Sequence, residues 1–225
     1  EDLRNNPAIH YEEDEVTRII QDQVNEKIYG EIKHWTVEEL REKILDTDTT
    51  GNDIRRLSRG LTAEMIAAVT KLMSNLDLIV GAKKIIVLAH CNTTIGHEGT
   101  LSTRLQPNHP TDNEEGIVAS LLEGLSYGAG DAVLGLNPVD DTLESVSRMF
   151  HKLDEVKNKF KIPTQTSVLA HVTTQMEAIK QGAPADLIFQ SIAGSEKGNT
   201  DFGINAEMIA EARDLVLKEG TSAGP

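Results

Sequence analysis

The sequence predicts an α/β protein in which an N-terminal helical region precedes the first half of a (β/α)8 TIM barrel. Three observations lead to this prediction. The early residues show helical periodicity, and later ones form four short apolar runs separated by longer helical patterns. Polar residues follow these runs abruptly, as at the carboxyl ends of barrel strands. They are Asn92-Thr93-Thr94, Asn137-Pro138, His171-Val172-Thr173 and Gln190-Ser191. We therefore expect a helical region over residues 1–81 and about four β/α units over residues 82–225.

The helical region is predicted from apolar spacing and from a start signal. Apolar side chains within residues 16–24 recur on one helix face, and Thr36-Val37-Glu38-Glu39 has the form of a capping box. A further apolar stripe over residues 62–80 predicts a helix that is broken at Gly81. We expect Met65, within this stripe, to pack in the core.

The half-barrel is predicted from four apolar runs too short for helices and without two-residue alternation, a pattern typical of parallel strands buried on both faces. We expect these strands at residues 85–89, 132–136, 167–170 and 187–189. We expect helices at about residues 114–127, 141–160, 173–181 and 206–218.

A doubly wound sheet is the other α/β arrangement, but no nucleotide-binding fingerprint favours it. Gly124, Gly128 and Gly130 precede a strand instead of linking a strand to a helix, so a turn is their expected role. A closed barrel needs eight strands, and four would leave two apolar edges exposed. Together with the missing initiator Met, this leads us to expect a segment of a longer chain.

Composition excludes several classes of protein. The net charge of −14 disfavours binding to nucleic acid or anionic membranes. No apolar run is long enough to span a bilayer, and no signal sequence is visible. The single cysteine, Cys91, cannot form an internal disulfide, so we expect a cytoplasmic protein, with Cys91 as a buried thiol.

Common catalytic signatures are absent from the sequence. The seven histidines include no pair at helical metal-ligand spacing, so no metal site is predicted. No Gly-x-Ser-x-Gly motif occurs. The segment Ser102–Asn108 is more informative, because Arg104 and Gln106 lie on the same side of it if it is extended. A guanidinium and an amide together can hold a small polar ligand.

Several uncommon sequence blocks, in order along the whole chain, resemble the large subunit of ethanolamine ammonia-lyase. These blocks are Asn6-Pro7, Leu57–Thr62, Asn92–Gly96, Arg104–Asn108, Gly130–Val133, Gly135–Pro138, Pro163–Gln165, Leu169–Gln175 and Ile188–Gly198. The resemblance implies a (β/α)8 barrel that binds adenosylcobalamin and converts ethanolamine to acetaldehyde and ammonia by radical chemistry.

The resemblance also implies site residues, although it identifies no certain catalytic residue. Substrate-contacting positions match Arg104, Leu105, Gln106 and Asn137, and positions that contact the corrinoid or its adenosyl group match Pro138, Gln190, Ser191 and Asp201. We expect Arg104 to stabilise the substrate hydroxyl, and Asn137 and Gln106 to orient the amine. No carboxylate stands at the four strand ends to meet a cationic amine. We therefore expect residues 1–225 alone to be inactive.

The family further implies a small-subunit partner, a homo-oligomer of large subunits and enclosure in a bacterial microcompartment. Two other functions stay open from the residues themselves. A barrel aldolase or isomerase could bind a phosphorylated substrate through Arg104, although no strand end offers a Schiff-base lysine. A noncatalytic acidic assembly protein would account for the charge but not for the polar strand ends.

Overall fold

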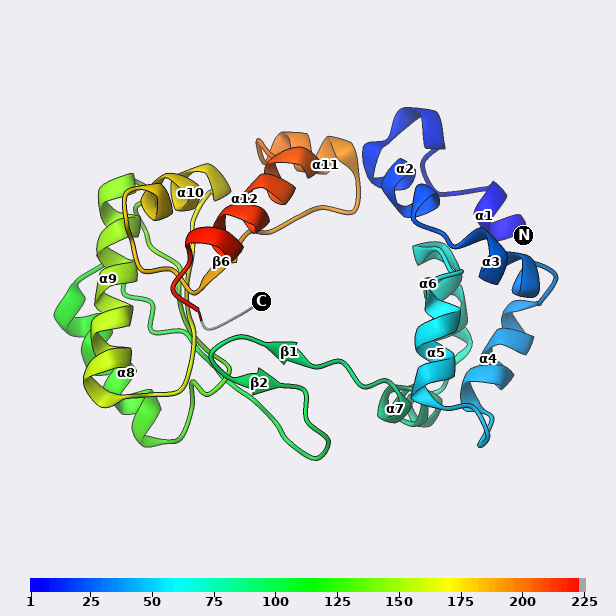
Figure 1. Cartoon of the computed structure of the whole chain (residues 1–225), viewed down its shortest axis with the longest axis horizontal. Coiled ribbons are helices and arrows are strands. Elements are labelled where there is room, and N and C mark those ends of the chain that lie inside the picture. The colour runs from blue at the N-terminus through cyan, green and yellow to red at the C-terminus, as the bar shows by residue number, and fades with distance from the viewer. Residues whose placement is uncertain (223–225) are drawn as a thin grey trace. The chain divides into compact units, whose positions relative to one another are not determined.

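The computed structural model describes residues 1–222, which form two compact units (Figure 1). The helical unit comprises Glu1–Val87 and Ala193–Gly203. The sheet unit comprises Leu88–Ile192 and the chain from Ile204 onward. No helix among the described residues is long and apolar enough to cross a membrane.

The helical unit contains short helices, most of which begin with a side-chain N-cap. Its elements are α1 (Asp2–Asn5), the 3-10 turn η1 (Tyr11–Glu13), α2 (Glu15–Asp22), α3 (Glu26–Ile32), α4 (Val37–Leu45), α5 (Gly51–Ser58), α6 (Ala63–Leu72), α7 (Asn75–Lys84) and α11 (Glu196–Asp201). The predicted capping box is confirmed, because Thr36 and Glu39 exchange side-chain and backbone bonds at the start of α4. Met65 is buried as expected.

The single helix predicted over residues 62–80 is wrong. The chain breaks at Met73-Ser74, and Ser74 begins α7 with a second capping box to Asp77. The apolar periodicity runs through this break, although Leu76 and Ile79 of α7 are exposed, and so it conceals the new cap. Gly81, the predicted breakpoint, lies inside α7.

Helix α11 joins the helical unit through a reciprocal contact with α2. The backbone N–H of Glu196 donates to the Asp14 carboxylate at 2.6 Å, and the backbone N–H of Glu15 donates to the Glu196 carboxylate at 2.5 Å. Each helix start therefore receives an acidic side chain from the other, which suits the positive end of both helix dipoles.

The sheet unit has a four-stranded parallel sheet in the order β3-β4-β5-β6, which confirms the mixed α/β class. Its strands are β3 (Arg104–Leu105), β4 (Val133–Leu136), β5 (Thr166–Leu169) and β6 (Leu187–Phe189), and a separate antiparallel pair consists of β1 (Ala89–His90) and β2 (Thr94–Ile95). The helices are α8 (Glu114–Ser126), α9 (Leu143–Phe160), α10 (Val172–Lys180) and α12 (Ala206–Glu219). Three predicted strands and all four predicted helices of this region are confirmed, to within a few residues. The sheet formed by the described residues is open and does not close into a barrel.

The first predicted strand, at residues 85–89, is wrong. Ala89–His90 pairs only with β2, and Ile85, Ile86 and Val87 are 50–70% exposed. The first strand of the sheet is instead β3, which lies in the segment Ser102–Asn108, where no strand was predicted. Asp131, just before β4, stabilises the register of β3 and β4. Its carboxylate accepts both the backbone N–H and the hydroxyl of Thr103, just before β3, at 2.8 Å. Local hydrophobicity could not reveal this pairing, because it depends on a contact between two loops.

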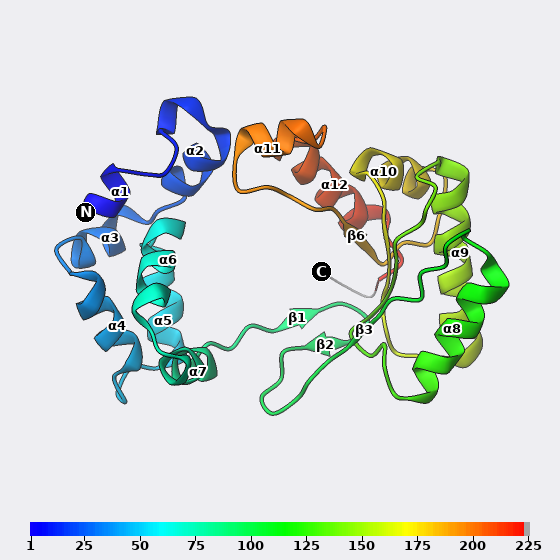
Figure 2. The same cartoon turned by 180° about the vertical axis from the view of Figure 1, so that it is seen from behind.

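The core lies between one face of the sheet and its helices. Leu134, Leu136 and Val168 project from this face and pack against apolar side chains of α8 and α9, including the fully buried Phe150. Helices α8, α9 and α10 lie together on this side of the strands (Figure 2). Because side chains alternate along a strand, Gly135 and the other intervening residues face the opposite side.

Candidate active site

Polar residues follow the carboxyl ends of β4, β5 and β6, as predicted, and Gln106 follows β3. Asn137, His171 and Gln190 come directly or almost directly after their strands. Because all four strands are parallel, these residues share one edge of the sheet. In open and closed α/β sheets, this edge is where ligands bind.

The predicted contribution of Asn92-Thr93-Thr94 to this edge is wrong. The Asn92 amide donates to the carbonyl of Thr164, and Thr93 donates to the side chain of Gln165, both of which precede β5. These residues therefore lie at the amino ends of the strands. Their displacement follows from the replacement of residues 85–89 by β3 as the first strand of the sheet.

Arg104 is the centre of the candidate site. Its Nη2 donates to Oδ1 of Asn137 at 3.2 Å, and its guanidinium lies 4.6 Å from the centre of the Phe189 ring. Residues from β3, β6 and the end of β4 thus meet at one group. Their convergence brings Arg104 and Asn137, two of the predicted substrate residues, into direct contact.

The guanidinium of Arg104 is partly removed from water. Burial lowers the pKa of Arg104, and no carboxylate among the described residues forms an ion pair with it. Its Nε is buried and has no hydrogen-bond partner there. A buried donor without a partner is costly, typically about 1–3 kcal/mol.

Gly135 makes room for Arg104. A Cβ atom at Gly135 would lie 2.6 Å from Nε and 2.7 Å from Nη2 of Arg104. The guanidinium therefore packs over the bare backbone of β4. A glycine inside a strand can indicate such a close approach, so Gly135 could have been found from the sequence. Phe189 carried no comparable signal, because its contact with Arg104 depends on how the strands are arranged.

The loops at this edge are joined to one another by side-chain bonds to the backbone. The Asp141 carboxylate accepts the His171 N–H at 3.1 Å, and Oε1 of Gln190 accepts the Val172 N–H at 2.8 Å. The fully buried Gln175 bonds the carbonyl of Ala170 and both backbone groups of Phe189. These bonds hold the ends of β5 and β6 together and thereby fix Phe189 under Arg104.

The remaining predicted residues have different positions. Leu105 belongs to β3 and packs at the border of the core, whereas Gln106 is exposed at the end of that strand. Pro138 follows Asn137 and is half-buried, and Ser191 is exposed after Gln190. Asp201 belongs to the helical unit, where it ends α11 and forms an exposed ion pair with Lys197 at 3.0 Å.

Gln190 is the predicted cofactor residue whose geometry can be tested against that role. Its Nε2 donates one hydrogen to the Ser191 carbonyl at 2.9 Å, and its Oε1 accepts the Val172 N–H. An amide group has two N–H donors and two acceptor lone pairs, so one of each is left for a bound group. Gln190 and the exposed Ser191 hydroxyl therefore fit a ligand rich in hydroxyl groups and ring nitrogens, such as a nucleoside.

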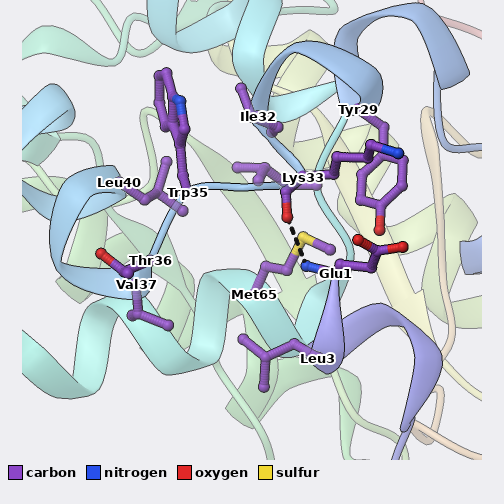
Figure 3. Close-up of a pocket in the computed structure, with 11 residues that line it drawn as sticks. Glu1, Leu3, Tyr29, Ile32, Lys33, Trp35, Thr36, Val37, Leu40 and Met65 are labelled. Atoms are coloured by element: carbon purple, nitrogen blue, oxygen red, sulfur yellow. Dashed lines mark hydrogen bonds between the residues drawn. The ribbon is translucent and has the colours of Figure 1, made fainter.

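The helical unit also contains a small pocket around Tyr29, Trp35 and Met65, which Figure 3 shows. Its volume of about 40 Å³ suits a few water molecules. The hydrogen bond drawn there joins the N-terminal amine to the Lys33 carbonyl. No group of acidic, histidine and cysteine side chains among residues 1–222 could hold a metal ion.

Comparison with known proteins identifies relatives over the whole chain. The family model described as "Ethanolamine ammonia lyase large subunit (EutB)" matches residues 1–225. The ethanolamine ammonia-lyase large subunits of Escherichia coli K12 and Salmonella typhimurium LT2 are each 56% identical to it over 223 residues, which is 99% of this chain and 49% of each relative. The chain therefore spans about half the length of these relatives.

Proposed function

Because the chain belongs to the ethanolamine ammonia-lyase large-subunit family, we propose that the whole protein deaminates ethanolamine to acetaldehyde and ammonia, with adenosylcobalamin as cofactor. The observation that carries this proposal is the convergence of Arg104 and Asn137 at the carboxyl edge of the sheet. This pair offers a partly buried cationic donor beside a neutral amide, which suits a small amino alcohol.

The residues of this chain bind and orient the substrate. The guanidinium of Arg104 donates to the substrate hydroxyl and stabilises charge that develops on this oxygen. Asn137 accepts from the substrate amine through the remaining lone pair of Oδ1, and Gln106 adds a second amide. Fixed neutral groups of this kind hold a migrating amine without an additional charge.

We propose that Pro138, Gln190 and Ser191 of the sheet unit contact the cofactor, and that Asp201 of the helical unit has the cofactor role that the family implies. The spare donor and acceptor of Gln190 support this placement, whereas Asp201 is assigned from the family alone. When bound, adenosylcobalamin supplies the radical chemistry that begins hydrogen removal from the substrate. Protein groups exclude water and keep the substrate in the reactive orientation.

The remaining expectations are proposals about the whole protein. We propose that the open sheet is half of a (β/α)8 barrel and that the chain divides into domains at residues 1–81 and 82–225. We propose a small-subunit partner, a homo-oligomer of large subunits and a location in a bacterial microcompartment. Residues 1–225 alone should form no acetaldehyde. Among the described residues, no carboxylate bonds to the side chains of Arg104 and Asn137, so none is placed there to pair with the cationic amine of the substrate.

The test uses the complete large subunit assembled with its small subunit and supplied with adenosylcobalamin. Acetaldehyde is followed by its reduction with NADH and alcohol dehydrogenase. Arg104→Ala should raise the KM for ethanolamine and lower kcat/KM at least about 10-fold, since a hydrogen bond to a charged group contributes about 1.5–3 kcal/mol. Arg148→Ala, which removes an exposed arginine on α9 paired with Glu114 at 3.6 Å, is the matched control. Full turnover and unchanged affinity in Arg104→Ala would show that the assigned role is wrong.

A further inference from the structure

The loop between β3 and α8 binds the backbone of the loop that follows β4. Oδ1 of Asn108 accepts the backbone N–H of Asn137 at 2.9 Å. The Asp112 carboxylate accepts the N–H of Val139 at 2.9 Å and that of Asp140 at 3.1 Å. Pro138 has no N–H. A single loop therefore supplies an acceptor for every backbone N–H of residues 137–140.

Asp112 occupies an unusual position for an acidic residue. It is only 6% exposed, and its φ angle of 51° lies in the left-handed region that residues with a Cβ seldom adopt. Its own N–H donates to the carbonyl of His109 at 3.2 Å, which closes a turn. This turn directs a carboxylate inward instead of exposing it to water, and the backbone N–H groups of Val139 and Asp140 replace its hydration.

These contacts determine where the Asn137 side chain lies. The backbone N–H of Asn137 donates to Asn108, and the N–H groups of the two residues after Pro138 donate to Asp112. The proline ring restricts the backbone of Asn137 further, because the residue before a proline is kept out of the helical region. With its backbone fixed on both sides, Asn137 presents Oδ1 to Nη2 of Arg104 at 3.2 Å.

We propose that Asp112 is a positioning residue for Asn137, and thereby for substrate binding. This inference rests on the proposed function. Asp112 acts through the backbone of residues 139 and 140 and does not itself contact the substrate. Loss of its carboxylate frees the loop after β4, and Asn137 no longer lies beside Arg104 in the unliganded protein. Substrate binding must then order this loop, which weakens affinity.

Two substitutions and one control separate positioning from general stability. Asp112→Asn keeps one oxygen that can accept a backbone N–H, but its NH2 group then faces a backbone N–H and cannot bond to it. Asp112→Ala removes all the hydrogen bonds of this side chain to Val139 and Asp140. The control is Asp131→Asn, because Asp131 also joins the loops of β3 and β4 through a carboxylate, at 2.8 Å from the Thr103 nitrogen. Asp131 lies at the amino ends of the strands, the edge opposite to Asn137.

The experiment uses the complete large subunit with its small subunit. It measures kcat and KM for ethanolamine, the Kd of ethanolamine for the cofactor-free protein by calorimetry, and the melting temperature. We expect KM and Kd to rise about 10-fold in Asp112→Asn and more in Asp112→Ala, as loss of a hydrogen bond to a charged group implies. Asp131→Asn should lower the melting temperature while KM and Kd stay within about twofold of wild type.

The possible outcomes distinguish this inference from the proposed function. If the wild-type protein does not deaminate ethanolamine, the proposed function is wrong. A crystal structure of Asp112→Asn would then test the inference separately, by showing whether Arg104 still donates to Asn137. Retention of this contact, or unchanged KM and Kd in Asp112→Asn, would overturn the inference. An equal rise of KM in Asp131→Asn would also overturn it. If Asp112→Ala does not fold, the milder Asp112→Asn decides the question alone.

Discussion

The packing of Arg104 over the bare backbone of β4 gives a direct prediction for Gly135→Ala. The added Cβ would lie 2.6 Å from Nε, 2.7 Å from Nη2 and 2.8 Å from Cζ of Arg104. Carbon atoms in contact with such groups are normally about 3.5–4.0 Å away. The flexible arginine side chain moves more readily than the strand, so the guanidinium leaves its place between Gly135 and Phe189.

Two contacts hold the guanidinium in place in the free protein. A hydrogen bond from a charged donor, here to Asn137, contributes about 1.5–3 kcal/mol, and an arginine over an aromatic ring contributes about 0.5–2 kcal/mol. The lower ends of these ranges together give about 2 kcal/mol. The clash with the added Cβ must exceed this free energy to displace the guanidinium. A ligand then loses its own hydrogen bond from this charged donor, about 1.5–3 kcal/mol, so its affinity should fall at least about 10-fold.

Ethanolamine affinity of the complete enzyme, measured by calorimetry without cofactor and as KM with it, tests this prediction. Gly30→Ala is the matched control, because Gly30 lies within α3 and no atom beyond its own helix backbone and chain neighbours comes within 4 Å of the place that a Cβ would take. Alanine there should be neutral or stabilise the protein by up to about 1 kcal/mol. A Gly135→Ala protein with affinity within about threefold of wild type, and with the guanidinium still over Phe189, would refute the reasoning.

Two further predictions concern stability. Asp186→Ala should lower the free energy of unfolding by about 3–5 kcal/mol. It removes the fully buried acceptor of Lys157 at 2.7 Å and of the Thr166 N–H at 2.9 Å, and leaves Lys157 with only the partly exposed Asp154 at 3.1 Å. Glu155→Ala, which removes an exposed carboxylate, should cost less than about 1 kcal/mol, and equal losses in urea denaturation would contradict this. Hydrogen bonds from Thr103 lower the pKa of Asp131 in the folded protein, so its contribution to stability is present above the ordinary carboxyl pKa and is lost as pH falls through the lowered value. Unfolding measured from about pH 5 downward should therefore be less acid-dependent in Asp131→Asn than in wild type, and parallel curves would count against this assignment.

Much of the sheet unit could be predicted from local patterns. The strands at residues 132–136, 167–170 and 187–189 are continuous apolar runs, and the helices between them have clear periodicity. Local patterns failed where packing partners decided the outcome. The apolar residues 85–88 have no sheet neighbour, whereas the more polar Arg104–Leu105 forms a strand through its pairing with β4. The break between α6 and α7 was hidden because the apolar stripe continues across it.

The sequence predicted which residues lie at the carboxyl edge of the sheet, but not the contacts around Arg104. Parallel strands bring their carboxyl ends to one edge, so the order of strands and helices alone indicated that Asn137 and Gln190 would share it. The sequence blocks around these residues also identified the family. Neither kind of information showed that Gly135 and Phe189 form the surroundings of Arg104, or that Asp112 holds the loop after β4.

The sequence by itself thus determined the alternation of strands and helices, the family and the residue types at the strand ends, because these depend on short-range periodicity and on recognisable local blocks. Only the tertiary structure decided which segment is the first strand of the sheet and which side chains surround Arg104. These contacts join residues from separate strands and loops, so they depend on strand register and on the space that each side chain leaves for its neighbours.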